Sequence, residues 1–471
     1  MRRRRQGRQT AADKARSSQD LEAAPSGLIF TSHRKQTAVR FLGIGDYCDL
    51  GSLYLRLQEE GHEVRVAIEN SLCHGTLCGM LDRTDDWRSE LQWIRSAGTD
   101  GIILFENVAK SRGRLQDELR RDGFQVVGGS AYGDRLETER GHAQRLLGDV
   151  GMRTAQFWEF DSPSEAIRFL HSQPGRYVLK YNGATSVENY VGRLVDGRDV
   201  KAFLLAKLRQ TDGAGASLVL QRHIEGVEMG VGAYFDGDKF LRPACLDWEH
   251  KRFFPGNLGE LTGEMGTVGT YDRSTYFFEQ TLFRVEHLFR QEGHCGYVNL
   301  NTIVNEEGIW PLEFTCRFGY PGFAILDPLQ ETPWGEIFRR MCSRSHNSFD
   351  YRPGFSVGIV LTTPPFPYAR PAVAEPAGLP VLFEGELSPE DKANLHFGEV
   401  GLAGEELVTS GIFGWTMVAT GVGPSIVAAQ SKANCLADRV LAPDVRYRRD
   451  IGNELIARDY DRVKNWGFFG D

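Results

Sequence analysis

The sequence predicts a multidomain α/β protein. The chain has 471 residues, which at about 150 residues per domain corresponds to roughly three structural units. Short apolar strands alternate with helices over the first 130 residues, a pattern typical of a parallel sheet covered by helices. Hydrophobic residues make up 41% and charged residues 25% of the chain, which is ordinary for a globular protein. Because apolar runs are too short to cross a bilayer, we expect no membrane span.

We expect a basic tail over residues 1–36 and an N-terminal α/β domain over residues 37–130. In that domain the pattern predicts strands at 39–44, 63–68, 101–105 and 124–127, and helices at 50–60, 87–96 and 115–121.

We expect a second domain over residues 131–350, with a smaller lid-like subdomain at about 153–226. Its helices are predicted at 136–150, 164–172, 200–208 and 276–291, and its strands at 155–159, 177–180 and 217–221. Two hairpins follow, with strands 231–235 and 239–245 around residues 236–238, and strands 298–304 and 310–314 around residues 305–308. Residues 249–273 are rich in glycine and predict a loop. A C-terminal domain, 351–471, is expected to hold strands 355–362, 407–410 and 416–420 and a helix at 425–440.

Charge is distributed unevenly along the chain. Residues 1–20 carry seven basic and two acidic side chains, a balance of +5, while the whole chain has a net charge of -8. The tail lacks apolar periodicity, so we expect it to be disordered. The acidic remainder argues against a nucleic-acid-binding core; contact of the tail with nucleic acid, or a role as an Arg-rich transit segment, stays open.

Cysteine usage indicates a reducing compartment. Eight cysteines in 471 residues are too few for a disulfide scaffold, and we see no apolar signal segment, so we expect a cytoplasmic protein. Cys73 and Cys78 flank His74, but no second pair follows at zinc-ligand spacing.

Four separated segments carry residue types that nucleotide chemistry needs. Lys180 ends a strand and Arg140 lies on the preceding helix, so both could place a cation near phosphate oxygens. Residues 218–228 form a strand entering a turn, whose backbone could read an adenine edge and whose Glu228 could accept hydrogen bonds from ribose hydroxyls. Asn301 and Glu313 lie on the two arms of the second hairpin, where oxygen ligands could share Mg²⁺.

The order and spacing of these segments resemble the ATP-grasp superfamily, specifically glycinamide ribonucleotide synthetase, over roughly residues 39–457. Residues 312–319, Leu-Glu-Phe-Thr-Cys-Arg-Phe-Gly, are similar to the family's Glu-Phe-Asn-x-Arg-Phe-Gly. Residues 249–252, Glu-His-Lys-Arg, are similar to Asp-His-Lys-Arg, and the stretch 261–267, Leu-Thr-Gly-Glu-Met-Gly-Thr, resembles Thr-Gly-Gly-Met-Gly. Residues 407–411 and 447–452 resemble parts of the family's C-terminal domain.

The resemblance implies an ATP-grasp fold and an ADP-forming carbon–nitrogen ligase that joins a small-molecule carboxylate to an amine through an acyl phosphate, with ATP and Mg²⁺. Transfer of a phosphoryl group to a carboxylate brings anions together, so cations are needed. The implied catalytic residues are Arg317 and Lys180. Implied ATP contacts are Arg140, Lys180, Gln221, Ile224 and Glu228; implied metal ligands are Asn301, Glu313 and Thr315; implied substrate contacts are His250, Lys251, Arg252, Gly263, Met265 and Gly266.

Three segments depart from the family pattern. After the first strand the family has Gly-Gly-Arg-Glu-His-Ala, whereas residues 43–48 read Gly-Ile-Gly-Asp-Tyr-Cys. We therefore expect a sugar phosphate to bind less favourably beside the negative charge of Asp46. The family's glycine-rich phosphate lid is replaced at residues 181–188 by Tyr-Asn-Gly-Ala-Thr-Ser-Val-Glu, without a second lysine. Thr315 replaces an asparagine, and Tyr320-Pro321-Gly322 replaces Asp-Pro-Glu.

These departures leave alternatives open. The default activity is that of a phosphoribosylamine–glycine ligase in purine synthesis. A divergent ligase with another acid or amine is the second reading, and a nucleotide-binding protein that no longer catalyses is the third.

Overall fold

The computed structural model describes residues 38–106, 112–181, 189–210, 217–373 and 377–470. Residues Ala38–Asp471 form one compact unit. The expected tail at 1–36 and lid positions 182–188 lie outside the described residues. Within the described part, no helix combines the length and apolar character needed to span a membrane.

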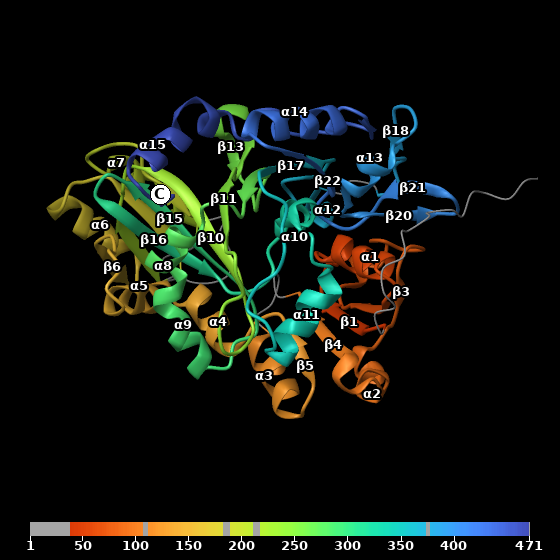
Figure 1. Ribbon diagram of the computed structural model, residues 1–471. Coiled ribbons are helices and arrows are strands. Elements are labelled where there is room, and N and C mark those ends of the chain that lie inside the picture. The colour runs from red at the N-terminus through yellow and green to blue at the C-terminus, as the bar shows by residue number, and fades with distance from the viewer. Residues whose placement is uncertain (1–37, 107–111, 182–188, 211–216, 374–376, 471) are drawn as a thin grey trace, which may run out of the picture. The chain divides into compact units, whose positions relative to one another are not determined.

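The first sheet has five strands in the order β3-β2-β1-β4-β5, and every neighbouring pair is parallel (Figure 1). Phe41 on its central strand packs into one apolar cluster, while Leu42 and Ile44 pack into another. Both faces are therefore covered, which explains the uninterrupted apolar run of this strand. The parallel N-terminal sheet is confirmed. Its elements are β1 (Arg40–Gly45), α1 (Gly51–Glu59), β2 (Glu63–Ile68), β3 (Asp82–Arg83), α2 (Leu91–Ser96), β4 (Gly101–Phe105), α3 (Gly113–Arg121) and β5 (Gln125–Val127).

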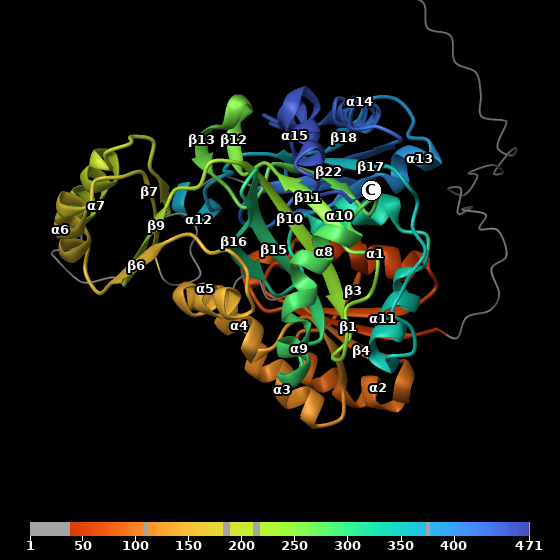
Figure 2. The same cartoon turned by 60° about the vertical axis from the view of Figure 1, so that its left-hand side comes forward.

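A smaller antiparallel sheet follows, in the order β6-β9-β7-β8. Helices α6 and α7 pack against each other and lie on one side of this sheet (Figure 2). Trp158, Phe169 and Tyr177 contribute aromatic contacts between the sheet and α6. The elements here are α4 (Ala131–Thr138), α5 (Arg140–Asp149), β6 (Phe157–Phe160), α6 (Pro163–Ser172), β7 (Tyr177–Tyr181), β8 (Tyr190–Val191), α7 (Arg198–Gln210) and β9 (Leu218–Arg222).

The largest sheet has eight strands in the order β16-β15-β10-β11-β14-β17-β22-β19, all antiparallel. Helix α14 packs along β17 and β22 (Figure 1). The sheet runs without a break through the boundary expected near residue 350, and the exact domain limits stay predictions. Its strands are β10 (Val227–Phe235), β11 (Cys245–Glu249), β14 (Gly266–Thr270), β15 (Gly296–Asn305), β16 (Gly308–Thr315), β17 (Phe355–Thr362), β19 (Leu395–Phe397) and β22 (Trp415–Gly423).

The remaining elements are short pairs of strands and the helices around them. The strand pairs are β12 (Arg252–Phe254) with β13 (Leu258–Leu261), β18 (Leu382–Phe383) with β23 (Val440–Leu441), and β20 (Val400–Ala403) with β21 (Glu406–Thr409). The helices are α8 (Thr275–Gln280), α9 (Leu282–Gln291), α10 (Gly322–Leu326), α11 (Trp334–Ser343), α12 (Arg370–Val373), α13 (Pro389–Ala393), α14 (Ile426–Ala437) and α15 (Tyr460–Asn465).

Tertiary contacts alter several predicted elements. The helix predicted over 136–150 is two helices, α4 and α5, which break at Glu139 (φ -99°, ψ 74°). The predicted loop 249–273 contains β12, β13 and β14. A strand predicted at 239–245 is missing from the described ladders. The turn before it is present, since the Asp236 side chain accepts hydrogen bonds from the backbone N–H groups of Asp238 and Lys239 (both 2.8 Å). Pro243 has no N–H to donate to a neighbouring strand, and β11 begins only at Cys245.

A carboxylate organises the loop that enters β22. Glu399 is buried, and its side chain accepts hydrogen bonds from the backbone N–H groups of Ile412 (2.9 Å), Phe413, Gly414 and Trp415 (3.2 Å). Gly414 has a φ of +88°, and a Cβ there would lie 2.2 Å from the carbonyl oxygen of Thr363. Only glycine fits this position, which places the Trp415 side chain.

We expect Gly414→Ala to lower the free energy of unfolding by about 2–4 kcal/mol, because it adds left-handed strain to a backbone clash. Gly404→Ala is the matched control: its φ is +68° and a Cβ would meet no atom within 4 Å, so the expected cost is about 1 kcal/mol. Urea denaturation measures both. Equal losses in the two variants would show that the Thr363 clash relaxes freely.

Candidate active site

Two adjoining cavities lie between the small antiparallel sheet and the eight-stranded sheet. The larger site cavity, about 520 Å³, is lined by Lys180, Gln221, Ile224 and Glu228 among other residues. The smaller site cavity, about 270 Å³, is lined by Asn301, Thr315, Arg317 and Gly263 among others. Both include Glu249, Lys251 and Glu313 in their walls. The fold thus brings together residues that are more than 130 positions apart in the sequence.

Lys180 and Gln221 come from neighbouring strands, β7 and β9, and both face the larger site cavity. Burial lowers the pKa of Lys180 to about 8, although Glu313 and Glu228 act in the opposite direction. Gln221 is buried, and its Nε2 has no hydrogen-bond partner among the described residues. A buried amide donor without a partner is costly, so this position suits a ligand that accepts a hydrogen bond.

Glu313 is the charge centre of the site. Its carboxylate forms an ion pair with Arg140, and Lys251 Nζ lies 4.0 Å from its Oε1. Burial alone would raise the pKa of Glu313, but Lys180, Arg140 and Lys251 outweigh it and hold that pKa far below the usual range. Glu313 is therefore ionised at all physiological pH values.

Lys251 is held by three carboxylates. Its Nζ lies 2.9 Å from Glu249 Oε2 and 3.7 Å from Glu228 Oε1, in addition to Glu313. Burial opposes the charge, yet Glu249, Glu228 and Glu313 raise the pKa of Lys251 well above its ordinary value. The ammonium thus links the walls of the two cavities.

The register of one hairpin aligns the predicted metal ligands. On β15 and β16, Asn301 pairs with Glu313 and Asn299 pairs with Thr315, so four oxygen-bearing side chains line the smaller site cavity. Asn301 Nδ2 donates to Glu249 Oε2 (3.3 Å), which orients the amide. Among the described residues, no group of three or more His, Cys, Asp or Glu side chains is arranged to hold a metal ion. The donors fit Mg²⁺, which uses few protein carboxylates and completes its shell with phosphates and water.

Arg317 lies just beyond β16 and lines the smaller site cavity. Its Nε is 3.3 Å from Glu137 Oε2, and one terminal nitrogen donates to the carbonyl oxygen of Phe318 (3.3 Å). Glu137 is itself fixed by the backbone N–H of Cys316 (2.7 Å). Helix α4 therefore positions the guanidinium at the cavity wall.

The predicted substrate contacts divide into two groups. Lys251 and Gly263 line the cavities, and so do His250 and Arg252 in the larger one. His250 Nε2 accepts the backbone N–H of Gly452 (3.1 Å), and burial together with Arg448 lowers its pKa to about 4. Met265, by contrast, is fully buried against Phe253 and Phe366, and Gly266 pairs in β14. Neither belongs to the lining of the two site cavities, because the second half of the glycine-rich segment is strand rather than loop.

Sequence reasoning missed several residues of the smaller site cavity, namely Asp247, Asn299, Glu264, Tyr320 and Trp415 in its lining. Asp247 and Asn299 had a readable pattern, because alternate residues of a strand share a face. Asn299 lies two positions before the predicted ligand Asn301, and Asp247 lies two positions before Glu249, the first residue of the Glu-His-Lys-Arg motif. Glu264 lies between the predicted contacts Gly263 and Met265, so its motif position was a signal, whereas Trp415 had none, because a loop distant in sequence brings it there.

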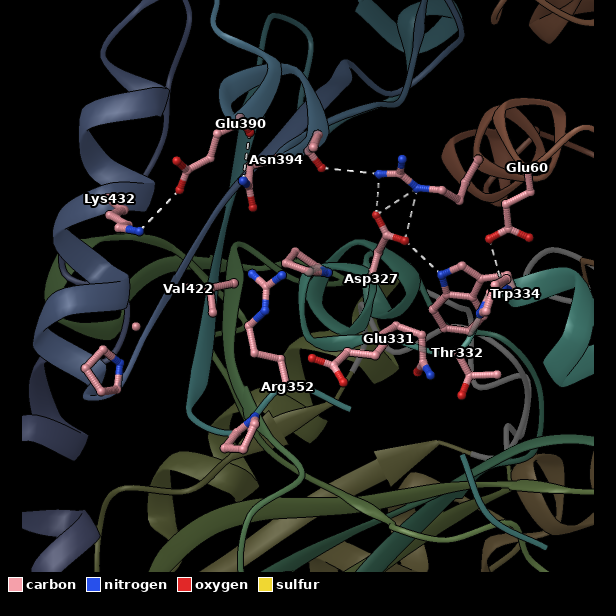
Figure 3. Close-up of a pocket in the computed structure, with 18 residues that line it drawn as sticks. Glu60, Asp327, Glu331, Thr332, Trp334, Arg352, Glu390, Asn394, Val422 and Lys432 are labelled. Atoms are coloured by element: carbon pink, nitrogen blue, oxygen red, sulfur yellow. Dashed lines mark hydrogen bonds and ion pairs between the residues drawn. The ribbon is translucent and has the colours of Figure 1, made fainter. Parts of the chain in front are cut away.

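A third hollow, about 820 Å³, lies elsewhere and differs in character (Figure 3). Its charged groups largely satisfy one another: Arg56 binds Asp327 (2.7 Å), Lys432 lies 3.3 Å from Glu390, and Glu60 accepts the first N–H groups of α11. None of the predicted site residues lines this hollow.

Comparison with known proteins shows which family this chain resembles. Residues 138–323 match the family model for the phosphoribosylglycinamide synthetase ATP-grasp (A) domain. These residues form an ATP-grasp domain. The chain resembles the phosphoribosylamine–glycine ligase of Pseudomonas aeruginosa, with 25% identity over 73% of this chain and 80% of that protein. The ligase of the same name from a Nostoc species is 24% identical over 78% of this chain and 87% of that protein.

Solved structures share the ATP-grasp fold. The phosphoribosylamine–glycine ligase of Thermotoga maritima superposes with a TM-score of 0.66 at 22% identity, covering 88% of this chain and 100% of that one. The biotin carboxylase domain of Hydrogenobacter thermophilus 2-oxoglutarate carboxylase, in complex with MgADP, ADP and bicarbonate, gives a TM-score of 0.59 at 10% identity, covering 93% of this chain and 100% of that one.

Burial sets the titration of Asp247 in this ATP-grasp protein. Burial and then Glu249 raise the pKa of Asp247 from 3.8 to about 8. A carboxyl whose pKa is raised by folding stabilises the fold less as the pH climbs from the unfolded pKa to the folded one.

We therefore expect Asp247→Asn to raise Tm, and the gain to grow between pH 5 and pH 8 by at most about 1.4 kcal/mol of unfolding free energy per pH unit. Asparagine keeps an acceptor for Asn299 Nδ2, which is 2.7 Å from Asp247 Oδ2 in the parent. Differential scanning calorimetry at both pH values measures the effect. A gain that is the same at each pH would show that Asp247 is ionised throughout.

Proposed function

We propose that this chain is an ADP-forming carbon–nitrogen ligase, which uses ATP and Mg²⁺ to join a carboxylate to an amine through an acyl phosphate. The observation that carries the proposal is Glu313, held among Arg140, Lys180 and Lys251 where the two site cavities meet. The ligase names of the relatives from Pseudomonas aeruginosa and Nostoc agree with it. The default substrates are those of a phosphoribosylamine–glycine ligase.

The larger site cavity is proposed to seat the nucleotide. Gln221 Nε2 and the adjoining backbone around Ile224 would face the base, and Glu228 would accept hydrogen bonds from ribose hydroxyls. Lys180 and Arg140 would then meet the phosphates at the end nearest Glu313. This order directs the terminal phosphoryl group toward the smaller site cavity, where the carboxylate substrate would lie.

The residues around the smaller site cavity are proposed to neutralise the negative charge of the reacting groups. Mg²⁺, when bound, neutralises charge on phosphoryl oxygens, and Asn301, Glu313 and Thr315 would hold it. Lys180 would attract the phosphate oxygens, and Arg317 would offer two parallel donors to the oxygens that gain charge during transfer. Glu137 would keep the guanidinium oriented while this happens.

We expect Lys180→Met to weaken ATP binding about tenfold to a hundredfold, because it removes a charged donor from a buried phosphate seat. Since the pKa of Lys180 is about 8, ATP affinity of the parent should also fall as the pH rises from 7 to 9. Isothermal titration calorimetry with Mg²⁺ measures both effects. Lys392→Met, which alters an exposed lysine on α13, is the control and should bind like the parent. Failure of the parent to bind ATP or ADP at millimolar concentration would refute the nucleotide assignment.

We expect Arg317→Lys to lower kcat about tenfold to a thousandfold while KM changes less, by comparison with removal of one oxyanion donor. Lysine keeps the charge but loses the bidentate geometry. Steady-state ADP release measures the change, and Tm should barely move. Arg339→Lys is the control, because Arg339 forms a comparable pair with Asp100 (2.8 Å) outside both cavities. An unfolded Arg317→Lys protein, or an unchanged kcat, would make Arg317 a structural residue.

A further inference from the structure

Two carboxylates in the smaller site cavity lack the partners that burial normally requires. Asp247 and Glu264 are each only 7% exposed. Asp247 Oδ2 accepts from Asn299, but its Oδ1 has no partner among the described residues, and the same holds for Glu264 Oε1. An enclosed carboxylate without hydrogen bonds costs several kcal/mol if it is ionised. These oxygens therefore stand ready for a ligand that donates protons or carries positive charge.

The cations of the cavity wall are engaged elsewhere. Lys251 and Arg317 are the only basic side chains in the described lining of the smaller site cavity. Lys251 Nζ lies against Glu249 (2.9 Å) and near Glu313, while Arg317 pairs with Glu137 (3.3 Å). No ion pair between either of them and Asp247 or Glu264 is present in the described part of the chain. A positive charge that pairs with these two side chains would therefore come from a ligand.

Aromatic rings also line the smaller site cavity. Tyr320 and Trp415 both line the cavity and stack with ring centroids 4.8 Å apart at 24°. A Cβ on Gly263 would lie 3.0 Å from the indole of Trp415, so the glycine lets the loop carrying Glu264 close against that ring. Aromatic faces attract bound ammonium groups.

The first-strand turn also disfavours an anionic substrate group. Residues 43–48 contain no counterpart of the arginine in the resembled family's turn, and Arg112 lies 2.9 Å from Asp46 Oδ2 and 2.7 Å from Glu69 Oε2. The nearby basic side chain is thus already neutralised. In the glycine-rich segment, Glu264 replaces the second glycine of the family's Thr-Gly-Gly-Met-Gly pattern. This difference adds a carboxylate to the lining of the smaller site cavity.

We propose that the smaller site cavity binds an ammonium group at the far end of a substrate chain, distinct from the reacting group and from the α-ammonium that glycine and every other amino acid carry. Asp247 and Glu264 would accept its hydrogen bonds, with Trp415 and Tyr320 covering its methylene chain. The substrate class is an amino acid or amine with a second, non-reacting ammonium. This inference rests on the proposed ligase function, because the cavity shares Glu249, Lys251 and Glu313 with the nucleotide seat.

Matched substrate pairs test the inference. On the amine side, 1,4-diaminobutane is compared with butylamine, with glycine as the acid. On the acid side, lysine and ornithine are compared with norleucine and norvaline, with hydroxylamine trapping the acyl phosphate as a hydroxamate and releasing phosphate. We expect at least one cationic compound to exceed its neutral partner by about tenfold or more in kcat/KM, because a neutral chain leaves buried carboxylates unpaired.

Variants of Asp247 and Glu264 then test whether these two residues cause the preference for cationic substrates. Glu264→Gln and Asp247→Asn should bring the ratio of cationic to neutral substrate close to one, while Tm stays the same or rises, since each removes an unpaired buried carboxylate. A purely structural carboxylate would instead lower Tm and leave the ratio intact. Glu306→Gln, in the exposed turn between β15 and β16, is the control and should keep the parent ratio.

The outcomes separate this inference from the ligase function. ATP-dependent ADP release at equal rates with cationic and neutral substrates would refute the proposed ammonium site but would still support the proposed ligase function. A parent ratio that Glu264→Gln and Asp247→Asn leave unchanged would likewise overturn it, as would a change confined to the Mg²⁺ requirement. ATP binding without ADP release from any pair would contradict both proposals.

Discussion

The neutralisation of buried charge around Glu313 is the constraint on which the rest of this site depends. The carboxylate sits on β16, and the cations that hold it come from α5, β7 and the segment after β11. A shift of any of these elements would leave a charge unpaired in the half-buried wall between the two cavities. The break at Glu139 between α4 and α5 fits this picture, because it lets Arg140 begin a new helix directed at Glu313 while Glu137, one turn earlier, fixes Arg317.

Much of this architecture could be read from the sequence, since it follows from periodicity. The strands predicted at 63–68, 101–105 and 355–362 have those limits in the structure. The last two are buried along nearly their whole length, and the first begins with Glu63 and Arg65 alternating with buried valines. The hairpin carrying Asn301 and Glu313 was equally readable, with a turn of Asn305 to Gly308 between alternating strands. Two local predictions were wrong. No strand forms over 239–245, where Pro243 cannot donate, and the glycine-rich stretch 249–273 contains the pair β12–β13 and strand β14, which lies between β11 and β17.

The site was readable to the extent that its residues share a strand with a recognisable motif. Lys180, Glu228 and Glu313 lie in segments whose residue types already implied nucleotide chemistry, Lys251 lies in a segment marked by the family resemblance, and the fold gathers all four. Glu264, Tyr320 and Trp415 reach the smaller site cavity from three separate loops or strand ends. Their meeting is decided by sheet order and by the Glu399 carboxylate that holds residues 412–415, and no spacing in the sequence records either. Substrate selectivity accordingly depends on the part of the site that pattern reasoning reaches last.

The continuity of the eight-stranded sheet has a consequence for how this protein can be divided. Strand β14, which follows the loop carrying Glu264, has β11 on one side and β17 on the other. A chain ending near residue 350 would keep the entire family-matched segment, yet it would expose the backbone N–H and C=O groups of β14 along a bare, largely apolar edge. Such edges recruit other chains. The family-matched segment is thus not a portable module, and grafting it onto another protein would require a replacement strand to seal that edge.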